Sequence, residues 1–277
     1  MVNRTMEFKL GKLKNEIWPV DACMQSVRIG IDRPALEGKK TYSSGCMVCG
    51  EQLLCLEEDR WLACHYCGRV TASSTCCEKD HHVCGHCYKD YSSSVIESLC
   101  RASTETDMLE MLKRLRRHPI VRVNGTEHHA LIPGIIIAAY RNNGGIIDSD
   151  LLSIAVQRGS KIMGGSCAYT GICGSVAGVG IAFSLLLQAD PHKAKERQTV
   201  QLLMQQVVGA VSSTQAPRCC QRESWASLKK AAELSRQYLS IELPANAVIG
   251  CQQLHLNEEC IGRECPVLKE KIAAKKV

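Results

Sequence analysis

Hydrophobic residues recur at helical spacing over most of the chain after residue 91. Met108, Leu112 and Leu115 would share one face of a helix, because steps of three and four residues return to the same side. Thr104-x-x-Asp107 has the form of the N-cap that such a helix needs. The same periodicity predicts further helices that include residues 95–99, 135–140, 150–156, 194–211 and 225–239.

The most apolar stretch runs from Ile162 to Ala189, 28 residues without a formal charge. A membrane span needs about 20 apolar residues, but a helix buried on all sides of a helical domain has the same composition. The strongly apolar part, Val176 to Leu187, is about half a span, and no aromatic belt flanks it. We therefore expect a buried, glycine- and cysteine-rich central helix within Gly164 to Phe183 and no membrane association.

The expected fold class is mainly α: a small, cysteine-rich module of the zinc-ribbon or treble-clef kind, followed by an all-helical domain around the central helix. In the N-terminal part, the alternation of Val27, Ile29 and Ile31 indicates a short strand, and Cys23 is expected to pack as a small hydrophobe. The predicted parts are an extension (1–43), a metal module (44–90), a helical domain (91–240) and a cysteine-containing tail that packs on it (241–277).

Cysteine is the unusual feature of the composition, with 18 residues. No apolar segment follows Met1, so we expect a cytoplasmic protein whose thiols bind metal rather than form disulfides. The net charge of +6 is mild, and the few aromatics argue against stacking on single-stranded nucleic acid. Nucleic acid is therefore not the expected partner. The basic residues at 113–117, at the end of a predicted helix, are expected to be solvated, and contact with an anion or RNA is the alternative.

Two Cys-x2-Cys pairs separated by fourteen residues are typical of a zinc ribbon, because each pair places two thiolates on one side of a tight turn. A further run, Cys77-x3-His81-x2-Cys84-x2-Cys87, has treble-clef or RING-like spacing. Cys76 could replace Cys77, His82 could replace His81, and one zinc rather than two interleaved zincs stays open. The predicted ligands of one or two structural zinc ions are Cys46, Cys49, Cys64, Cys67, Cys77, His81, Cys84 and Cys87.

A second set of seven cysteines is spread over about a hundred residues of the helical part and lacks histidine neighbours. Thiolates gathered from distant segments favour an iron–sulfur cluster over zinc. We expect one [4Fe–4S] cluster on Cys167, Cys173 and one of Cys219 or Cys220, with a tail cysteine such as Cys260 or Cys265 as fourth ligand or gate. The alternatives are a redox dithiol at Cys219–Cys220 without a cluster, and inert packing. The full set is Cys167, Cys173, Cys219, Cys220, Cys251, Cys260 and Cys265.

Glu127, His128 and His129 form a candidate acid–base or metal-binding group. The simpler interpretation is that one histidine is buried and hydrogen-bonded while the other is exposed. Arg218 and Arg222 flank the adjacent thiols at the start of a helix and would hold a carboxylate or another anion.

These landmarks resemble the cysteine-rich domain of unknown function 5714. The resemblance rests on His118-Pro119 with the glutamate–histidine group, on GGSCAYTGICGS, on Pro-Arg-Cys219-Cys220-Gln-Arg and on Cys260-x4-Cys265-Pro. The N-terminal cysteine pairs resemble the family too, which extends the likeness from about residue 46 onward. The resemblance implies the domain plan and an association with anaerobes and methyltransferase-like domains, but no particular activity.

A fainter similarity is to the iron–sulfur L-serine dehydratases and cysteine desulfidases, which carry Gly-Gly-Cys before a small-residue helix and a later Pro-Cys before an alanine-rich helix. Gly164-Gly165-Ser-Cys167 and Pro217-Arg-Cys219 follow that order. The similarity implies a cluster iron that acts as a Lewis acid on the leaving group of a substrate. The inserted serine, the doubled cysteine and the short domain depart from that pattern.

Two functions follow from these patterns. The first is an iron–sulfur-dependent lyase or sulfur transferase that acts on a small thiol, hydroxy or sulfur-containing substrate. The second is a non-catalytic accessory protein that senses redox state or transfers electrons and docks a partner enzyme or RNA through the zinc module.

Overall fold

The computed structural model describes residues 45–251, 253–257 and 259–274. The predicted extension, with its strand around Ile29 and with Cys23, lies outside the described residues. The elements in chain order are β1 (Leu53–Ala63), β2 (Val70–Cys77), α1 (Gly85–Ala102), α2 (Met108–Leu115), α3 (Glu127–Asn142), α4 (Leu151–Ser160), α5 (Ser166–Tyr169), α6 (Gly174–Leu186), α7 (Ala194–Ser212), α8 (Cys220–Tyr238), the 3-10 turns Leu254–Leu256 and Gly262–Glu264, and α9 (Pro266–Ala274).

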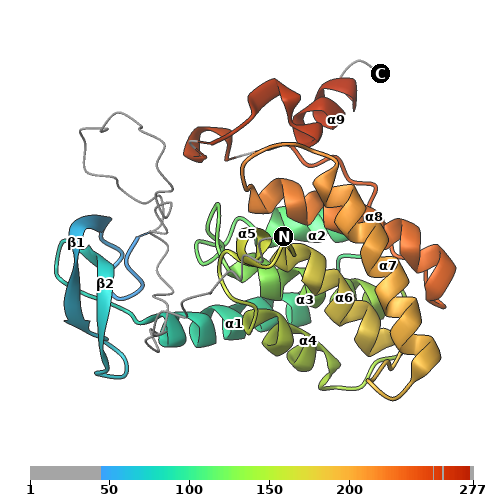
Figure 1. The fold of residues 1–277 in the computed structure, drawn as a ribbon, viewed down its shortest axis with the longest axis horizontal. Coiled ribbons are helices and arrows are strands. Elements are labelled where there is room, and N and C mark those ends of the chain that lie inside the picture. The colour runs from blue at the N-terminus through green and yellow to red at the C-terminus, as the bar shows by residue number, and fades with distance from the viewer. Residues whose placement is uncertain (1–44, 252, 258, 275–277) are drawn as a thin grey trace, which may run out of the picture.

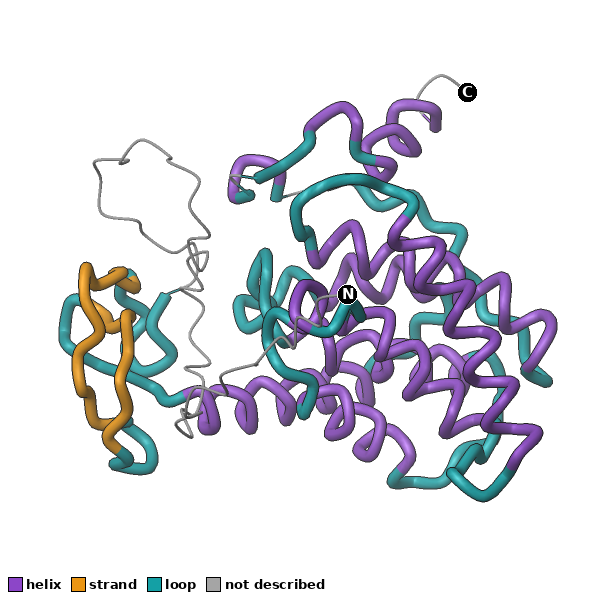
Figure 2. The backbone as a smooth tube through the Cα atoms, viewed as in Figure 1, coloured by secondary structure: helices purple, strands orange, loops and turns teal. Residues whose placement is uncertain are grey.

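Within the described residues, strands occur only in an antiparallel hairpin of β1 and β2, and the rest of the regular structure is helical (Figure 2). The hairpin lies at one end of the molecule, and α1 joins it to the helical body (Figure 1). The predicted mainly helical fold with a small cysteine-rich module is confirmed. The expected boundary between residues 90 and 91 falls inside α1, which continues without a break from the module into the helices.

The most deeply buried helix is α3, in which every residue from Glu127 to Ala139 is buried. It packs against α1, α4 and α6. The glycine- and cysteine-rich stretch forms its long helix only from Gly174, after the single turn of α5, because Gly165 (φ 76°) and Gly171 (φ 72°) adopt the left-handed conformation on either side of α5. Among the described helices, none combines the length and apolarity that crossing a membrane requires.

Glycine allows the close approach of α4 to α3. A methyl group on Gly159 would overlap the carbonyl oxygen of His129 and would lie 2.7 Å from Cα of Ala130. Pro133 has no N–H to donate to that same carbonyl four residues earlier in α3. The gap in the helical hydrogen bonding therefore lies where α4 comes nearest.

The C-terminal tail packs on α2 and α8. Asp107 caps α2 through Oδ1, which accepts from the N–H groups of Leu109 (2.9 Å) and Glu110 (3.1 Å). Its Oδ2 accepts from the N–H of Ala247 (3.2 Å), and the N–H of Met108 donates to the carbonyl of Pro244 (2.8 Å). One capping carboxylate thus joins the start of α2 to the tail.

A buried chain of hydrogen bonds joins the N-terminal ends of α3, α6 and α8. His128 Nε2 donates to the carbonyl oxygen of Arg122 (3.0 Å), so Nδ1 accepts from the hydroxyl of Ser224 (3.2 Å). Ser175 lies 3.1 Å from Ser224 and completes the chain. All three side chains are at most 1% exposed, so these polar groups must satisfy one another.

We expect Gly159→Ala to lower the free energy of unfolding by about 1–3 kcal/mol, because the added methyl meets backbone that cannot move aside. Gly209→Ala is the matched control, since no atom lies within 4 Å of a methyl built there in the exposed part of α7. That control should be neutral or stabilising by up to about 1 kcal/mol. Denaturant unfolding measures both, and equal effects of the two substitutions would contradict the close helix contact.

Burial holds the pKa of His128 well below its usual value. Below about pH 6.5 this histidine is therefore protonated in the unfolded chain but stays neutral in the folded chain. Its contribution to the free energy of unfolding is fully present above that pH and is lost as the pH falls. His128 should contribute a loss of about 1.4 kcal/mol between about pH 7.5 and about pH 5.5. His128→Gln, which does not titrate, should show a smaller loss by urea unfolding, and an identical pH dependence would show that His128 does not contribute.

Candidate metal sites and a convergence of cysteines

Each Cys-x2-Cys turn of the N-terminal module has the same backbone geometry. Gly50 (φ 76°) and Gly68 (φ 70°) follow the two turns in the left-handed conformation that glycine adopts easily. The N–H of Gly50 donates to the carbonyl of Cys46, and the N–H of Gly68 donates to that of Cys64, both at 2.8 Å. Local sequence therefore determines the shape of both turns.

The first predicted ligand group consists of Cys46, Cys49, Cys77 and His81, whose ligand atoms all lie within 4.8 Å of one another. The sulfur of Cys49 lies 3.8 Å from that of Cys77 and 3.3 Å from Nδ1 of His81. Thiolates about 3.8 Å apart suit a tetrahedral ion with Zn–S bonds of about 2.3 Å. This group can hold one metal ion.

The second group consists of Cys64, Cys67, Cys84 and Cys87, which also lie within 4.8 Å of one another. The sulfurs of Cys67 and Cys84 are 3.7 Å apart. Cys84 is the residue before the first turn of α1, and Cys87 lies inside that turn. The two groups alternate along the chain, so the sites are interleaved and each one ties the hairpin to the segment after it.

The neighbouring candidates Cys76 and His82 have other partners. Cys76 faces Asp80, and Nε2 of His82 lies 2.9 Å from the hydroxyl of Thr71. Successive residues of a strand point to opposite faces, so only Cys77 of the pair at the end of β2 reaches the first metal group.

Backbone N–H groups favour one thiolate in each group. Burial raises the pKa of Cys64, but the N–H groups of Cys84 and Cys67 outweigh this effect and bring it to about 6. Burial also raises the pKa of Cys77, but backbone N–H groups, including that of His81, outweigh this effect. The pKa of Cys77 is therefore lowered. Each group therefore contains a thiol prepared to ionise, as a metal ligand must.

The adjacent thiols at the start of α8 belong to two different surroundings. Cys220, like Cys167 and Cys173, is influenced electrostatically by Glu223, and Cys220 also acts on Cys173. Cys219 lines a cavity together with three cysteines of the tail. The seven cysteines of the second set thus divide into a group of three and a group of four.

Glu223 is the centre of the group of three. The thiol of Cys173 donates to Oε2 of Glu223 (2.8 Å), and the N–H of Cys219 donates to Oε1 (3.3 Å). Burial and this carboxylate raise the pKa values of Cys167, Cys173 and Cys220, the last to about 12. The thiols are consequently protonated until a cation or a metal group takes the place of the protons.

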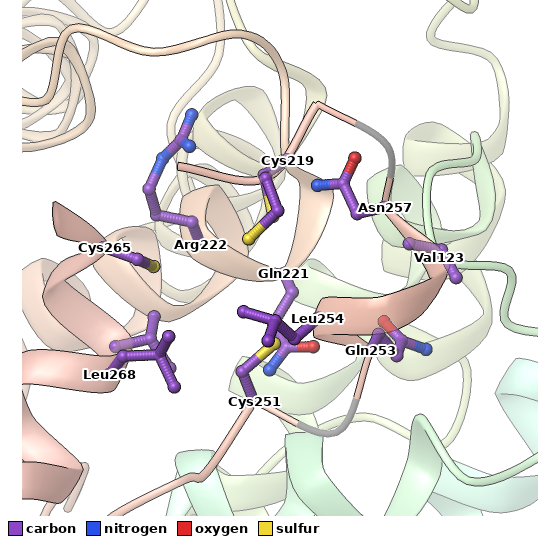
Figure 3. A pocket seen from close by; sticks show the side chains of 12 residues that line it. Val123, Cys219, Gln221, Arg222, Cys251, Gln253, Leu254, Asn257, Cys265 and Leu268 are labelled. Atoms are coloured by element: carbon purple, nitrogen blue, oxygen red, sulfur yellow. The ribbon is translucent and has the colours of Figure 1, made fainter. Parts of the chain in front are cut away.

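The group of four lines a small cavity of about 20 Å³ between α8 and the tail. Figure 3 shows the sulfur atoms of Cys219, Cys251 and Cys265 directed into the same space, with the side chain of Arg222 beside it. The remaining thiol that lines the cavity is that of Cys260.

The three residues at the start of α3 differ in what they can do. Both ring nitrogens of His128 are engaged in the buried chain described above. Glu127 is 1% exposed and pairs with Arg122 (2.7 Å) and the hydroxyl of Tyr88. His129 is different: Nδ1 donates to the carbonyl of Ile162 (3.3 Å), which leaves the lone pair on Nε2.

Nε2 of His129 faces the start of α6, where a methyl group on Gly174 would overlap the ring. Burial lowers the pKa of His129, while the Ile162 carbonyl and the carboxylates of Glu127 and Glu223 oppose that shift. The ring is therefore neutral near neutral pH and can accept a proton.

The two candidate arginines are placed differently. Arg218 is exposed and acts electrostatically on Cys167 and Cys220. Arg222 is 6% exposed, donates to the carbonyl of Pro217 (2.8 Å) and contacts Oε1 of Glu223 (3.4 Å). Arg218 can reach a ligand from solvent, whereas Arg222 holds Glu223 and lines the cavity.

Two residues of these sites carry no strong signal in the sequence. Glu223 resembles an ordinary acidic residue in the first turn of a helix, and only its four-residue separation from Cys219 hints at contact. Cys251 belongs to the second cysteine set, but no motif in the sequence distinguishes it from the other tail cysteines. It lines the cavity because the tail packs on α8.

The comparison with known families matches residues 96–268 to the "Family of unknown function (DUF5714)". The match includes all seven cysteines of the second set, whereas the N-terminal cysteine pairs lie outside it. No curated protein and no solved structure matches the chain, and the similarity to L-serine dehydratases and cysteine desulfidases is not shown. Because the match covers more than half of the chain, the protein belongs to the DUF5714 family of unknown function.

Proposed function

We propose that this protein is an iron–sulfur enzyme, a lyase or sulfur transferase, that acts on a small substrate with a thiol, hydroxyl or sulfur group. The observation that carries the proposal is the convergence of three thiols, Cys167, Cys173 and Cys220, on one buried carboxylate beside His129. Three thiolates would bind a [4Fe–4S] cluster and leave one iron without a cysteine ligand.

The donor set fits such a group chemically. The thiols come from the segments before α6 and at the start of α8, and the first turns of α3, α6 and α8 meet there. Helix N-termini carry partial positive charge, which favours an anionic cluster and anionic substrates. When bound, a cluster with an open iron supplies a Lewis acid for the hydroxyl, thiol or sulfur group of the substrate.

The chain's own residues supply the other roles. His129 takes a proton from the substrate at Nε2, since Nδ1 is engaged with the carbonyl of Ile162 and the lowered pKa keeps the ring neutral. Arg218 holds a carboxylate or similar anion of the substrate from the solvent side. His128, Glu127 and Arg222 position these groups: the first two hold the start of α3, and Arg222 holds Glu223.

We also propose that both metal groups of the N-terminal module hold zinc in a structural role. Each group offers four protein ligands, which completes a tetrahedron and leaves no position for water or substrate. The hairpin has few buried side chains apart from its cysteines, so a metal ion would supply much of its folding free energy.

The exposed side of the hairpin favours a second candidate function, the docking of a partner enzyme. Trp61 is 76% exposed, Val70 is 56% exposed and Tyr66 is 54% exposed, and large apolar side chains in solvent often mark contact surfaces. In that function the cysteine groups of the helical part would serve redox sensing or electron transfer instead of turnover.

For the zinc sites, we expect about two zinc ions per chain. Cys49→Ser and Cys67→Ser should each lose one ion, because each removes a ligand from a different group. Cys76→Ser is the matched control beside the ligand Cys77 and should keep both. Elemental analysis measures the content, and hydrogen exchange of residues 46–87 should rise on chelation. Loss of zinc in Cys76→Ser, or unchanged exchange after complete zinc removal, would contradict the proposal.

For the enzyme, we expect anaerobically reconstituted protein to turn over a small thiol or hydroxy acid. His129→Gln should lower kcat by about 10²–10⁴-fold with the iron content retained, and Arg218→Ala should act mainly on KM. His128→Gln serves as the matched control, with lower stability and a smaller effect on kcat. Equal turnover in His129→Gln and the wild type, or no turnover of any of these substrates by cluster-loaded protein, would exclude this mechanism.

A further inference from the structure

Four cysteines outside the proposed catalytic group line a single cavity. Cys219 is the residue before α8, and Cys251 and Cys265 come from the tail (Figure 3). The fourth cysteine, Cys260, also comes from the tail. They are separated by up to 46 residues of chain, so tertiary packing alone brings them together. None of them belongs to the catalytic group of Cys167, Cys173 and Cys220.

The spacing of these thiols differs from that in the N-terminal metal groups. There, four ligand atoms lie within 4.8 Å of one another, but no three of the tail-cavity thiols satisfy that limit in the part of the chain that the structure describes. A single zinc ion draws its thiolates to about 3.8 Å. A cluster spaces its thiolates further apart, because iron and sulfide lie between them.

Buried positive charge lies next to the same cavity. Arg116 acts electrostatically on Cys219, Cys220 and Cys251, and burial lowers its pKa to about 10 although these thiols oppose the shift. One amino group of Arg116 donates to Gln253, which lines the cavity, but Nε and Nη1 are buried without a partner among the described residues. A buried guanidinium with two unpaired nitrogen atoms is energetically costly unless an anion lies nearby.

The sequence alone gives a different expectation for Arg116, which stands in a basic run at a helix end and would normally be solvated. The structure turns this one arginine inward while Arg114 and Arg117 stay exposed. Arg222 also lines the cavity, but its guanidinium is engaged with Pro217 and Glu223. Arg116 therefore supplies the unpaired positive charge that would offset part of the negative charge of a thiolate-bound cluster.

Backbone N–H groups also point at the tail thiols. The N–H of Gly262 donates to the sulfur of Cys260 (3.3 Å), and the N–H of Gln253 stabilises the ionised form of Cys251. N–H groups directed at cysteine sulfur are a common way in which proteins stabilise a cluster and adjust its potential.

We propose that Cys219, Cys251, Cys260 and Cys265 bind a second iron–sulfur cluster, of the [4Fe–4S] type, separate from the proposed catalytic cluster. Four thiolates complete the coordination of this cluster, so it binds no substrate. The proposal goes beyond the proposed function and does not depend on it, because the two sites share no ligand. Cys219 and Cys220 are adjacent in the chain and would connect the two clusters through one peptide bond.

The test uses the full chain, purified without oxygen and reconstituted with ferrous iron and sulfide. Iron, sulfide and zinc are measured per chain, and electron paramagnetic resonance is recorded after reduction with dithionite. The variants are Cys251→Ser and Cys260→Ser for the tail cavity and Cys173→Ser for the catalytic group. Cys55→Ser, in β1 and outside every ligand set, is the matched control.

We expect the wild type and Cys55→Ser to bind about eight irons and eight sulfides, and each tail variant to bind about half as much. Cys173→Ser should lose the other half. Wild-type iron content in Cys251→Ser and Cys260→Ser would overturn the proposal. So would a zinc content above two per chain that falls in the tail variants while iron is unchanged. Loss in the tail variants with no loss in Cys173→Ser would support this site and contradict the proposed catalytic cluster.

Arg116→Gln provides a second test that keeps every cysteine. The variant should retain the iron of the wild type, because Arg116 is not a ligand, but the potential of one of the two resonance signals should become more negative as nearby positive charge is lost. Cys251→Ser should lack that same signal. An Arg116→Gln variant in which the potential of every cluster signal is unchanged would overturn the proposal even if the cysteine variants failed to fold.

Discussion

The arrangement of the helical part depends on the buried hydrogen bonds that join His128 to Ser224 and Ser224 to Ser175. These bonds hold the starts of α3, α6 and α8 together, and the polar atoms involved have no access to water that could replace them. Cys173 directly precedes α6, and Cys219 and Cys220 open α8. The same bonds therefore position the thiols, so a histidine that is expected from the sequence to do chemistry contributes by placing other residues.

A second consequence follows from the adjacency of Cys219 and Cys220. Neighbouring residues at the start of a helix point in different directions, so one thiol joins the group near Cys173 and the other joins the cavity of the tail. Glu223 accepts from the thiol of Cys173 and from the N–H of Cys219, while Arg222 holds the carboxylate. A change of charge at Cys173 therefore alters the electrostatic environment of Cys219 through Glu223.

Sequence spacing predicts what is local and fails where tertiary packing decides. The Cys-x2-Cys turns at Cys46 and Cys64 can be predicted from the sequence because their geometry depends on four or five consecutive residues. Helical periodicity likewise predicts α2, although its N-cap is Asp107, the last residue of the expected Thr104-x-x-Asp107 motif. The choice of Cys77 over Cys76 needs the register of β2, which spacing does not contain. The division of the second cysteine set and the inward turn of Arg116 depend on how the tail covers α8.

The two parts of the chain therefore use cysteine in different ways. The hairpin buries little apart from the residues of its two candidate metal groups, so a metal ion bound there would contribute directly to its folding. The helical part has a continuous aliphatic core around α3, including Ile132, Ile135 and Ile136 at 0% exposure, which stabilises it. Cys100 and Cys265 are part of that core and Cys173 packs against it, whereas the other cysteines of the second set lie outside it. A metal group bound by the cysteines outside the core would be taken up and lost while the scaffold persists, which suits a reactive or redox site.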